Sequence, residues 1–69
     1  KVDLVFEEDE TLVVVDYKSD AIAEEHALAQ AAHHAPQLQL YARGLAQAAG
    51  MPVRERLVVF TALGRAVPV

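Results

Sequence analysis

Leu12-Val13-Val14-Val15-Asp16-Tyr17-Lys18 is the stretch of sequence that decides the fold. This run is rich in β-branched residues and ends on charged ones, and it predicts a largely buried β-strand. Residues 2–6 alternate with the period of two that is typical of a second strand. The polar residues 7–10 separate the two strands, so a hairpin is the simplest connection between them.

A long helical region follows the hairpin. Residues 21–33 are alanine-rich and favour a helix. Pro36 is expected to interrupt or restart this helix, because proline suits a first helical turn. From Pro36 to Ala49 the apolar residues recur as a single stripe, and Gly50 is a natural stop. The residues of the stripe are Leu38, Ala42, Leu45 and Ala49.

The remainder of the chain favours two further strands. Residues 57–60 form a short continuous apolar run, as expected of a strand buried on both faces. Residues 66–69 are expected to form a last strand, which Pro68 keeps at an edge. A helix between the second and third strands acts as a crossover, so these strands should be parallel. The sequence therefore predicts an α/β fold: a mixed β-sheet with a β-hairpin, a crossover helix and a following strand.

The hairpin brings charged residues together. If Asp9-Glu10 is a two-residue loop, paired positions sum to 19 and Asp3 lies opposite Asp16. Lys18 shares their face of the sheet. Two carboxylates so close repel each other unless a cation lies between them, and a hard divalent ion such as Mg²⁺ suits them. A nearby lysine could orient water or neutralise phosphate charge. This arrangement indicates metal-assisted hydrolysis of a phosphodiester.

The two faces of the hairpin have different expected surroundings. One face is expected to be the core and carries Val2, Leu4, Phe6, Val13, Val15 and Tyr17. The charged face also carries Val5, Leu12 and Val14, and a helix from outside this chain is expected to cover it. The alternative interpretation is that the charged residues are simply solvated on an exposed face. A register slip of one residue would move Asp3 to the other face, and the loop lacks the glycine that such turns favour.

Size and composition limit the choice of function. The chain has 69 residues, enough for one small domain, and it begins at Lys1 without an initiator methionine. Its net charge is −4 and it has no basic stripe, so charge alone does not predict DNA binding. No apolar run approaches the roughly 20 residues of a membrane span. The absence of cysteine excludes disulfides and agrees with a cytoplasmic protein. Hydrophobic residues make up 54%, which favours a piece of a larger protein and a homodimer of that piece.

Three histidines raise the possibility of a zinc site. His26 and His33 are seven residues apart and could share a helix face, whereas His34 points elsewhere. Because the chain has no cysteine and no clear third ligand, solvent-exposed helix histidines are the favoured interpretation over structural zinc.

The hairpin and helix motifs together resemble a known family. Residues 2–6 and 12–20 resemble the catalytic hairpin of the PD-(D/E)XK nucleases, closest to the C-terminal nuclease domain of RecB- and AddA-type, UvrD-like helicase–nucleases. Those domains have an aspartate after a short apolar lead, then a D-Y-K-T type motif, then a helix with a Q-L-x-L-Y-A type motif. Here the last two are Asp16-Tyr17-Lys18-Ser19 and residues 37–42. The resemblance extends to about residue 61, with His34 where the family often has tyrosine.

The resemblance implies roles for particular residues. Asp3 and Asp16 would be metal ligands, with the main-chain carbonyl of Tyr17 as a further ligand, and Lys18 would be the catalytic lysine. Gln37 and Tyr41 would support the active site and contact DNA, since they lie one helical turn apart. The implied cofactor is Mg²⁺, for which Mn²⁺ can substitute.

The expected function is that of a metal-dependent DNA nuclease core within a helicase–nuclease for double-strand break repair and recombination. The resemblance implies a magnesium-dependent deoxyribonuclease with three partners: DNA, the helicase domains of the same parent chain and a second helicase/nuclease subunit. Residues 1–69 would be part of a restriction-endonuclease-like domain without its first helix, and this piece alone is expected to cleave little. The alternatives are a non-catalytic scaffold or DNA-binding module, and a small interaction domain with accidental motif matches.

Overall fold

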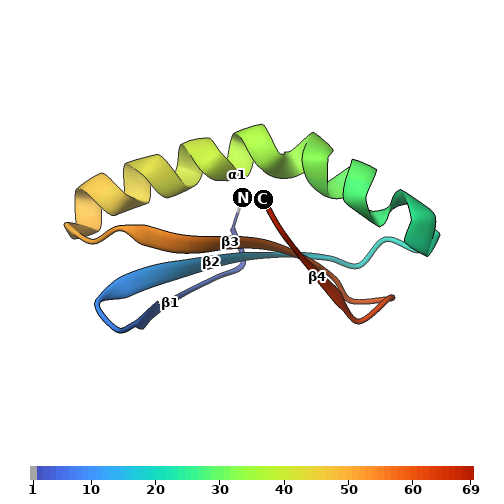
Figure 1. The fold of residues 1–69 in the computed structure, drawn as a ribbon, viewed down its shortest axis with the longest axis horizontal. Helices are drawn as coiled ribbons and strands as arrows, with labels where there is room; N and C mark the ends of the chain where they lie inside the picture. The colour runs from blue at the N-terminus through green and yellow to red at the C-terminus, as the bar shows by residue number, and fades with distance from the viewer. Residues whose placement is uncertain (1) are drawn as a thin grey trace.

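One long helix lies across one face of a β-sheet (Figure 1) in the computed structural model, which describes residues 2–69. The sheet formed by these residues has four strands in the order β1-β2-β3-β4. The central strands β2 and β3 are parallel, and both outer pairs are antiparallel. The predicted mixed α/β sheet is therefore confirmed. In chain order the elements are β1 (Leu4–Glu8), β2 (Thr11–Lys18), the short 3₁₀ helix η1 (Glu24–His26), α1 (Ala27–Ala49), β3 (Val53–Phe60) and β4 (Arg65–Pro68).

The β1–β2 hairpin has the predicted register. Its ladder runs from the pair Leu4 and Val15 to the pair Glu8 and Thr11, with residues 9–10 as the two-residue loop. Asp9 and Glu10 have φ of 54° and 62°. Both values are left-handed, as the favoured two-residue hairpin turns require, although glycine or asparagine usually supplies them. The Thr11 hydroxyl donates to the main-chain oxygen of Glu8 over 2.6 Å and helps to close the turn.

The helix α1 runs continuously through Pro36, so the expected interruption there is wrong. Proline lacks the N–H that would bond one turn back, which weakens the helix locally. Ala31 before it and Leu38 after it are both buried, and this packing holds the helix across the weak point. At the other end α1 stops at Gly50, as predicted, with φ of 69° and an N–H donated to Ala46 over 2.9 Å. Among the described residues, no helix combines the length and apolarity needed to cross a membrane.

The core lies between α1 and one face of the sheet, and this corrects one expectation. The covered face is the one that carries Asp16, because Val14, Val58 and Phe60 on it pack against α1. The crossover helix itself covers this face over β2 and β3, whereas Val5 of β1 on the same face is 36% exposed. The buried residues of this cluster are Val14, Ala27, Ala31, Leu38, Val58, Phe60 and Val67.

The opposite face of the sheet, which was expected to be the core, has no helix over it within residues 2–69 (Figure 1). Leu4, Phe6 and Tyr17 are 41%, 42% and 45% exposed there. Their neighbours Val13 and Val15 are nevertheless buried. Val2, expected on the same face, instead packs against the core cluster under α1. Both faces of β2 are apolar, so alternation along the strand does not reveal which face the crossover helix covers.

Candidate functional site

Asp16 is a charged side chain in an apolar position. It lies near the end of β2 with 8% of its surface exposed, next to Val58 of β3 in the parallel ladder. Its Oδ2 atom is 3.3 Å from Nζ of Lys18 on the same strand face. Burial of a carboxylate is unfavourable, and a partly buried ion pair adds little net stability. The position of Asp16 is therefore better explained by chemistry than by folding.

Asp3 lies at the start of the hairpin, close to the same end of β2. Its N–H donates to the main-chain oxygen of Val15 over 3.1 Å, and its Oδ2 accepts from the N–H of Tyr17 over 2.8 Å. The regular ladder starts only at Leu4, so Asp3 lies just outside it. The expected ladder pair between Asp3 and Asp16 is therefore not formed. The carboxylate has turned to the main chain of β2, which keeps it beside residues 16–18.

The motif residues line one cavity. A space of about 410 Å³ is bounded by residues from the start of the hairpin, the end of β2 and the first half of α1. It brings together two carboxylates, an ammonium group, an imidazole and a carboxamide. The lining residues are Asp3, Asp16, Tyr17, Lys18, His34 and Gln37.

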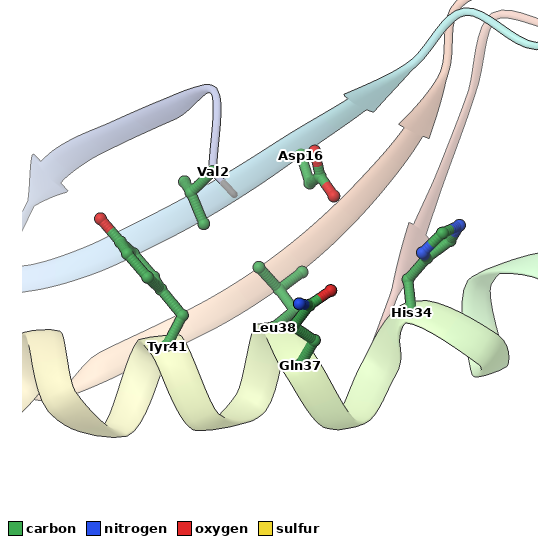
Figure 2. Close-up of a pocket in the computed structure, with 6 residues that line it drawn as sticks. All are labelled: Val2, Asp16, His34, Gln37, Leu38 and Tyr41. Carbon is green, nitrogen blue, oxygen red and sulfur yellow. The ribbon is translucent and has the colours of Figure 1, made fainter.

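A smaller space joins the side chains of α1 to Asp16. It has about 10 Å³, roughly the room for one water molecule. Figure 2 shows His34, Gln37 and Tyr41 rising from α1 on the side that faces the sheet. Tyr41 thus lines this second space and not the larger cavity, whereas Asp16, His34 and Gln37 line both. The remaining lining residues are Val2 and Leu38.

His34 lines the candidate site, although the sequence interpretation expected it to be a solvent-exposed helix histidine. It is half-buried and lines both spaces. Its own burial lowers its pKa below the ordinary histidine range, and the positive charge of Lys18 lowers it further. The spacing of His34, Gln37 and Tyr41, i, i+3 and i+7, puts them on one helix face and was the available signal. His26 and His33 are exposed and line a separate groove.

The arrangement of charges fits a hard divalent cation. Within residues 2–69, His, Cys, Asp and Glu form no cluster of three or more placed to hold a metal ion. Asp3 and Asp16 nevertheless line the same cavity. Mg²⁺ needs only one or two carboxylates, since waters and substrate oxygens complete its coordination. The donor set is therefore adequate for Mg²⁺ and has no soft ligand for a thiophilic metal.

Comparison with known proteins identifies the family. A family model described as the PD-(D/E)XK nuclease superfamily matches residues 1–66. The chain belongs to the PD-(D/E)XK nuclease superfamily. This PD-(D/E)XK chain is also 33% identical over 64 residues, 93% of its length, to an ATP-dependent helicase/nuclease subunit, of the AddA type, from Lachnoclostridium phytofermentans. It spans about 5% of the length of that relative. Both matches confirm the resemblance to nucleases of the RecB and AddA type that the hairpin and helix motifs indicated.

The PD-(D/E)XK match covers every element that builds the cavity. The matched residues include β1, β2, α1 and β3. Asp16 and Lys18 of β2 lie within the matched residues. The cavity is therefore the part of this PD-(D/E)XK chain in which a nuclease site is to be sought.

Proposed function

We propose that this chain forms the metal-binding active-site core of a DNA nuclease that hydrolyses phosphodiester bonds. The observation that carries the proposal is the single cavity shared by Asp3, Asp16 and Lys18. Membership of a nuclease superfamily supports it independently. The similarity to a helicase/nuclease subunit supports a setting in a larger helicase–nuclease. The proposal places that protein in the cytoplasm and in DNA repair and recombination, with helicase domains and a second subunit as partners.

The proposed metal ligands are the carboxylates of Asp3 and Asp16 and the main-chain carbonyl of Tyr17. Mg²⁺, or Mn²⁺ in its place, would supply Lewis-acid stabilisation of phosphoryl charge and activation of a water molecule. The hydrogen bond from the Tyr17 N–H to Asp3 holds that carboxylate against β2. The Asp3 carboxylate is therefore orientated by the main chain before any ion binds.

Lys18 is proposed as the catalytic lysine. Its ammonium group lies 3.3 Å from Asp16 and lines the cavity. From there it could stabilise the negative charge that develops on phosphoryl oxygens, or orient the attacking water. Gln37 and Tyr41, on the side of α1 that faces the sheet, are proposed to hold the nucleic-acid strand beside these groups (Figure 2).

The first test is a Mg²⁺ and Mn²⁺ titration that follows thermal stability and cleavage of labelled DNA. A ligand at 100 times its Kd stabilises a protein by about 2.7 kcal/mol, which raises the melting temperature of so small a domain by several degrees or more. Asp16→Asn should abolish this rise. It should also lower cleavage by about 100-fold or more, the upper range for groups that only support a metal.

Glu25→Gln is the matched control, because Glu25 is exposed and lies outside the cavity. It should keep the metal-induced rise. Metal stabilisation that is equal in the wild type and in Asp16→Asn, together with wild-type cleavage that Asp16→Asn does not reduce, would reject the nuclease proposal. That outcome would favour the alternative of a non-catalytic nuclease-fold scaffold or DNA-binding module.

A further inference from the structure

The charge of the chain is divided unevenly along the sequence. Residues 1–25 contain nine of the ten acidic residues, whereas residues 26–69 contain four arginines and only Glu55. The first part therefore carries −7 and the second part +3. The helix α1 has no acidic residue at all, and Arg43 is its one permanently charged side chain. Residues 26–69 are therefore positively charged although the net charge of the whole chain is −4.

Among residues 2–69, two of the four arginines have acidic partners and two have none. Arg54 pairs with Glu8, and Arg65 pairs with Glu24 over 3.1 Å. Within residues 2–69, Arg43 and Arg56 make no ion pair. An arginine without a carboxylate partner keeps its planar set of donors available for an oxyanion.

These two unpaired arginines line the same groove. The groove has about 340 Å³ and lies between the second half of α1 and the first half of β3, where the two elements are joined (yellow and orange in Figure 1). Gln39, Arg43 and Ala46 are spaced i, i+4 and i+7, so they form one wall along the helix. The full lining is Gln39, Ala42, Arg43, Ala46, Val53 and Arg56.

Arg56 is held in place in this groove. It is half-buried, and its Nε donates to the main-chain oxygen of Val69 over 2.8 Å. In the β2–β3 ladder it pairs with Val14, which fixes its side chain on the face under α1. The outer nitrogens of a guanidinium tethered through Nε remain free to donate two parallel hydrogen bonds to one anion. Gln39 adds a neutral donor at the same groove.

We propose that the Arg43–Arg56 groove binds a backbone phosphate of a single nucleic-acid strand, as a contact separate from the Asp16 cavity. The inference rests on the proposed nuclease function for the identity of the ligand. Gln37 and Tyr41 lie on the flank of α1 beside Asp16, and Gln39 and Arg43 line the other groove. Residues 37 and 43 are only about 9 Å apart along a helix axis, so one strand crossing α1 can reach both sites.

The test is binding of a labelled twelve-residue oligothymidylate in EDTA, where cleavage cannot contribute, over a series of salt concentrations. For single strands the salt slope changes by about 0.7 for each phosphate contact, so the double change Arg43→Gln with Arg56→Gln, which removes the one proposed contact, should reduce the slope by about 0.7. At about 0.1 M salt this corresponds to a loss of affinity of about fivefold. Arg54→Gln removes the same charge from an arginine already paired with Glu8 and should change the affinity little.

Arg43→Gln alone keeps the test valid if the Arg56 change impairs folding, since Arg43 is exposed on the helix surface. Unchanged affinity and slope in the variants would overturn the proposal, as would a wild-type protein that does not bind the oligonucleotide even at about 20 mM salt. Inorganic phosphate and polyglutamate serve as competitors, because they show whether the groove binds a nucleic-acid strand or another anion. If the arginines affect binding of inorganic phosphate or of polyglutamate but not of the strand, the groove is not a nucleic-acid site.

The result for the Arg43–Arg56 groove can be separated from the result for the proposed nuclease site. Cleavage that depends on Asp16, together with strand binding that is indifferent to Arg43, would reject the groove alone. Strand binding that depends on Arg43, without any cleavage or metal effect of Asp16, would reject the nuclease site and retain the groove.

Discussion

At the scale of single residues, the candidate site depends on where each carboxylate finds its hydrogen bonds. Asp16 is buried beneath α1 with Lys18 as its partner, whereas Asp3 is exposed and bonded to the main chain of β2. A carboxylate that accepts a main-chain N–H has a fixed orientation, which reduces the cost of ordering it around a ligand. The two acids therefore differ in surroundings although they line one cavity.

Asp3→Asn should separate the structural role of this residue from its charge. Asparagine can still accept the N–H of Tyr17, so the free energy of unfolding should change by less than about 1 kcal/mol. The affinity for Mn²⁺ should fall about 10-fold or more, because one anionic ligand is lost. Asp3→Ala should lose both the hydrogen bond and the ion. Thermal melting with and without Mn²⁺ distinguishes them, and an Asp3→Asn variant with full metal affinity would exclude Asp3 as a ligand.

His34 should make stability depend on pH. Its folded pKa is lowered, first by burial, then by Lys18 and by His33, so the unfolded chain binds the proton more readily. The contribution of His34 to the free energy of unfolding is therefore fully present above its unfolded pKa of about 6.5. This contribution is lost as the pH falls through that value towards the lowered folded pKa. Urea unfolding in EDTA between about pH 5 and 8 measures this. His34→Gln should flatten the profile, and an unchanged slope in that variant would refute the assignment.

At the scale of elements, the sequence predicted features that depend on neighbouring residues. It predicted less well the features that depend on packing between distant elements. The hairpin register was predicted by assuming that residues 9–10 form a two-residue loop, since the apolar period alone does not exclude a slip of one residue. The order of elements predicted the parallel crossover. The continuity of α1 at Pro36 was not predictable, because packing of the helix against the sheet overrides the local preference of proline. The start of β3 was also missed, since its first residues Val53–Arg56 contain charges and pair with β2 across a register shift at Leu12 and Val13.

The same limit applies to the candidate site. The assumed hairpin register predicted that Asp3, Asp16 and Lys18 lie together, and the family resemblance implied that Gln37 supports them. Neither indicated that Asp3 would leave the ladder or that His34 would enter the cavity. These features depend on how far α1 extends over the end of β2, which is decided by packing between elements distant in sequence.

The β1–β2 turn should be open to stabilisation. Asp9 and Glu10 both adopt left-handed φ values. The left-handed helical conformation costs a non-glycine residue about 1–2 kcal/mol. Asp9→Asn combined with Glu10→Gly supplies the preferred pair for such a turn and should raise the free energy of unfolding by about 1 kcal/mol. Urea unfolding measures it. Glu10→Ala removes the charge but keeps the strained backbone, so a similar gain in that variant would point to charge rather than conformation.

At the scale of the whole molecule, the sheet is covered on one face only within the described residues. The uncovered face presents Leu4, Phe6 and Tyr17, which lie around the buried Val13 and Val15. Contiguous exposed apolar surface of this kind favours association. The homodimer expected from composition stays a prediction.

Phe6→Lys should reduce the apolar character of this face without unfolding the protein, because Phe6 is 42% exposed. The expected result is lower fluorescence of a surface-binding hydrophobic dye in the native state and higher solubility. Leu40→Lys changes an exposed apolar residue on α1 and serves as the comparison. If both variants lower dye binding equally, the face opposite α1 has no special role.

The main chain of residues 16–18 is held from several directions. These residues pair with β3, the Tyr17 N–H is bonded to Asp3, and the Lys18 carbonyl accepts from both the N–H and the hydroxyl of Thr61, over 3.0 and 3.3 Å. Fixing the backbone of one residue costs about 1–2 kcal/mol of conformational entropy at room temperature. Folding has already ordered this segment, so a ligand that docks here restricts side chains and water but little main chain. Its association should therefore be as fast as diffusion and charge allow, without a slow ordering step.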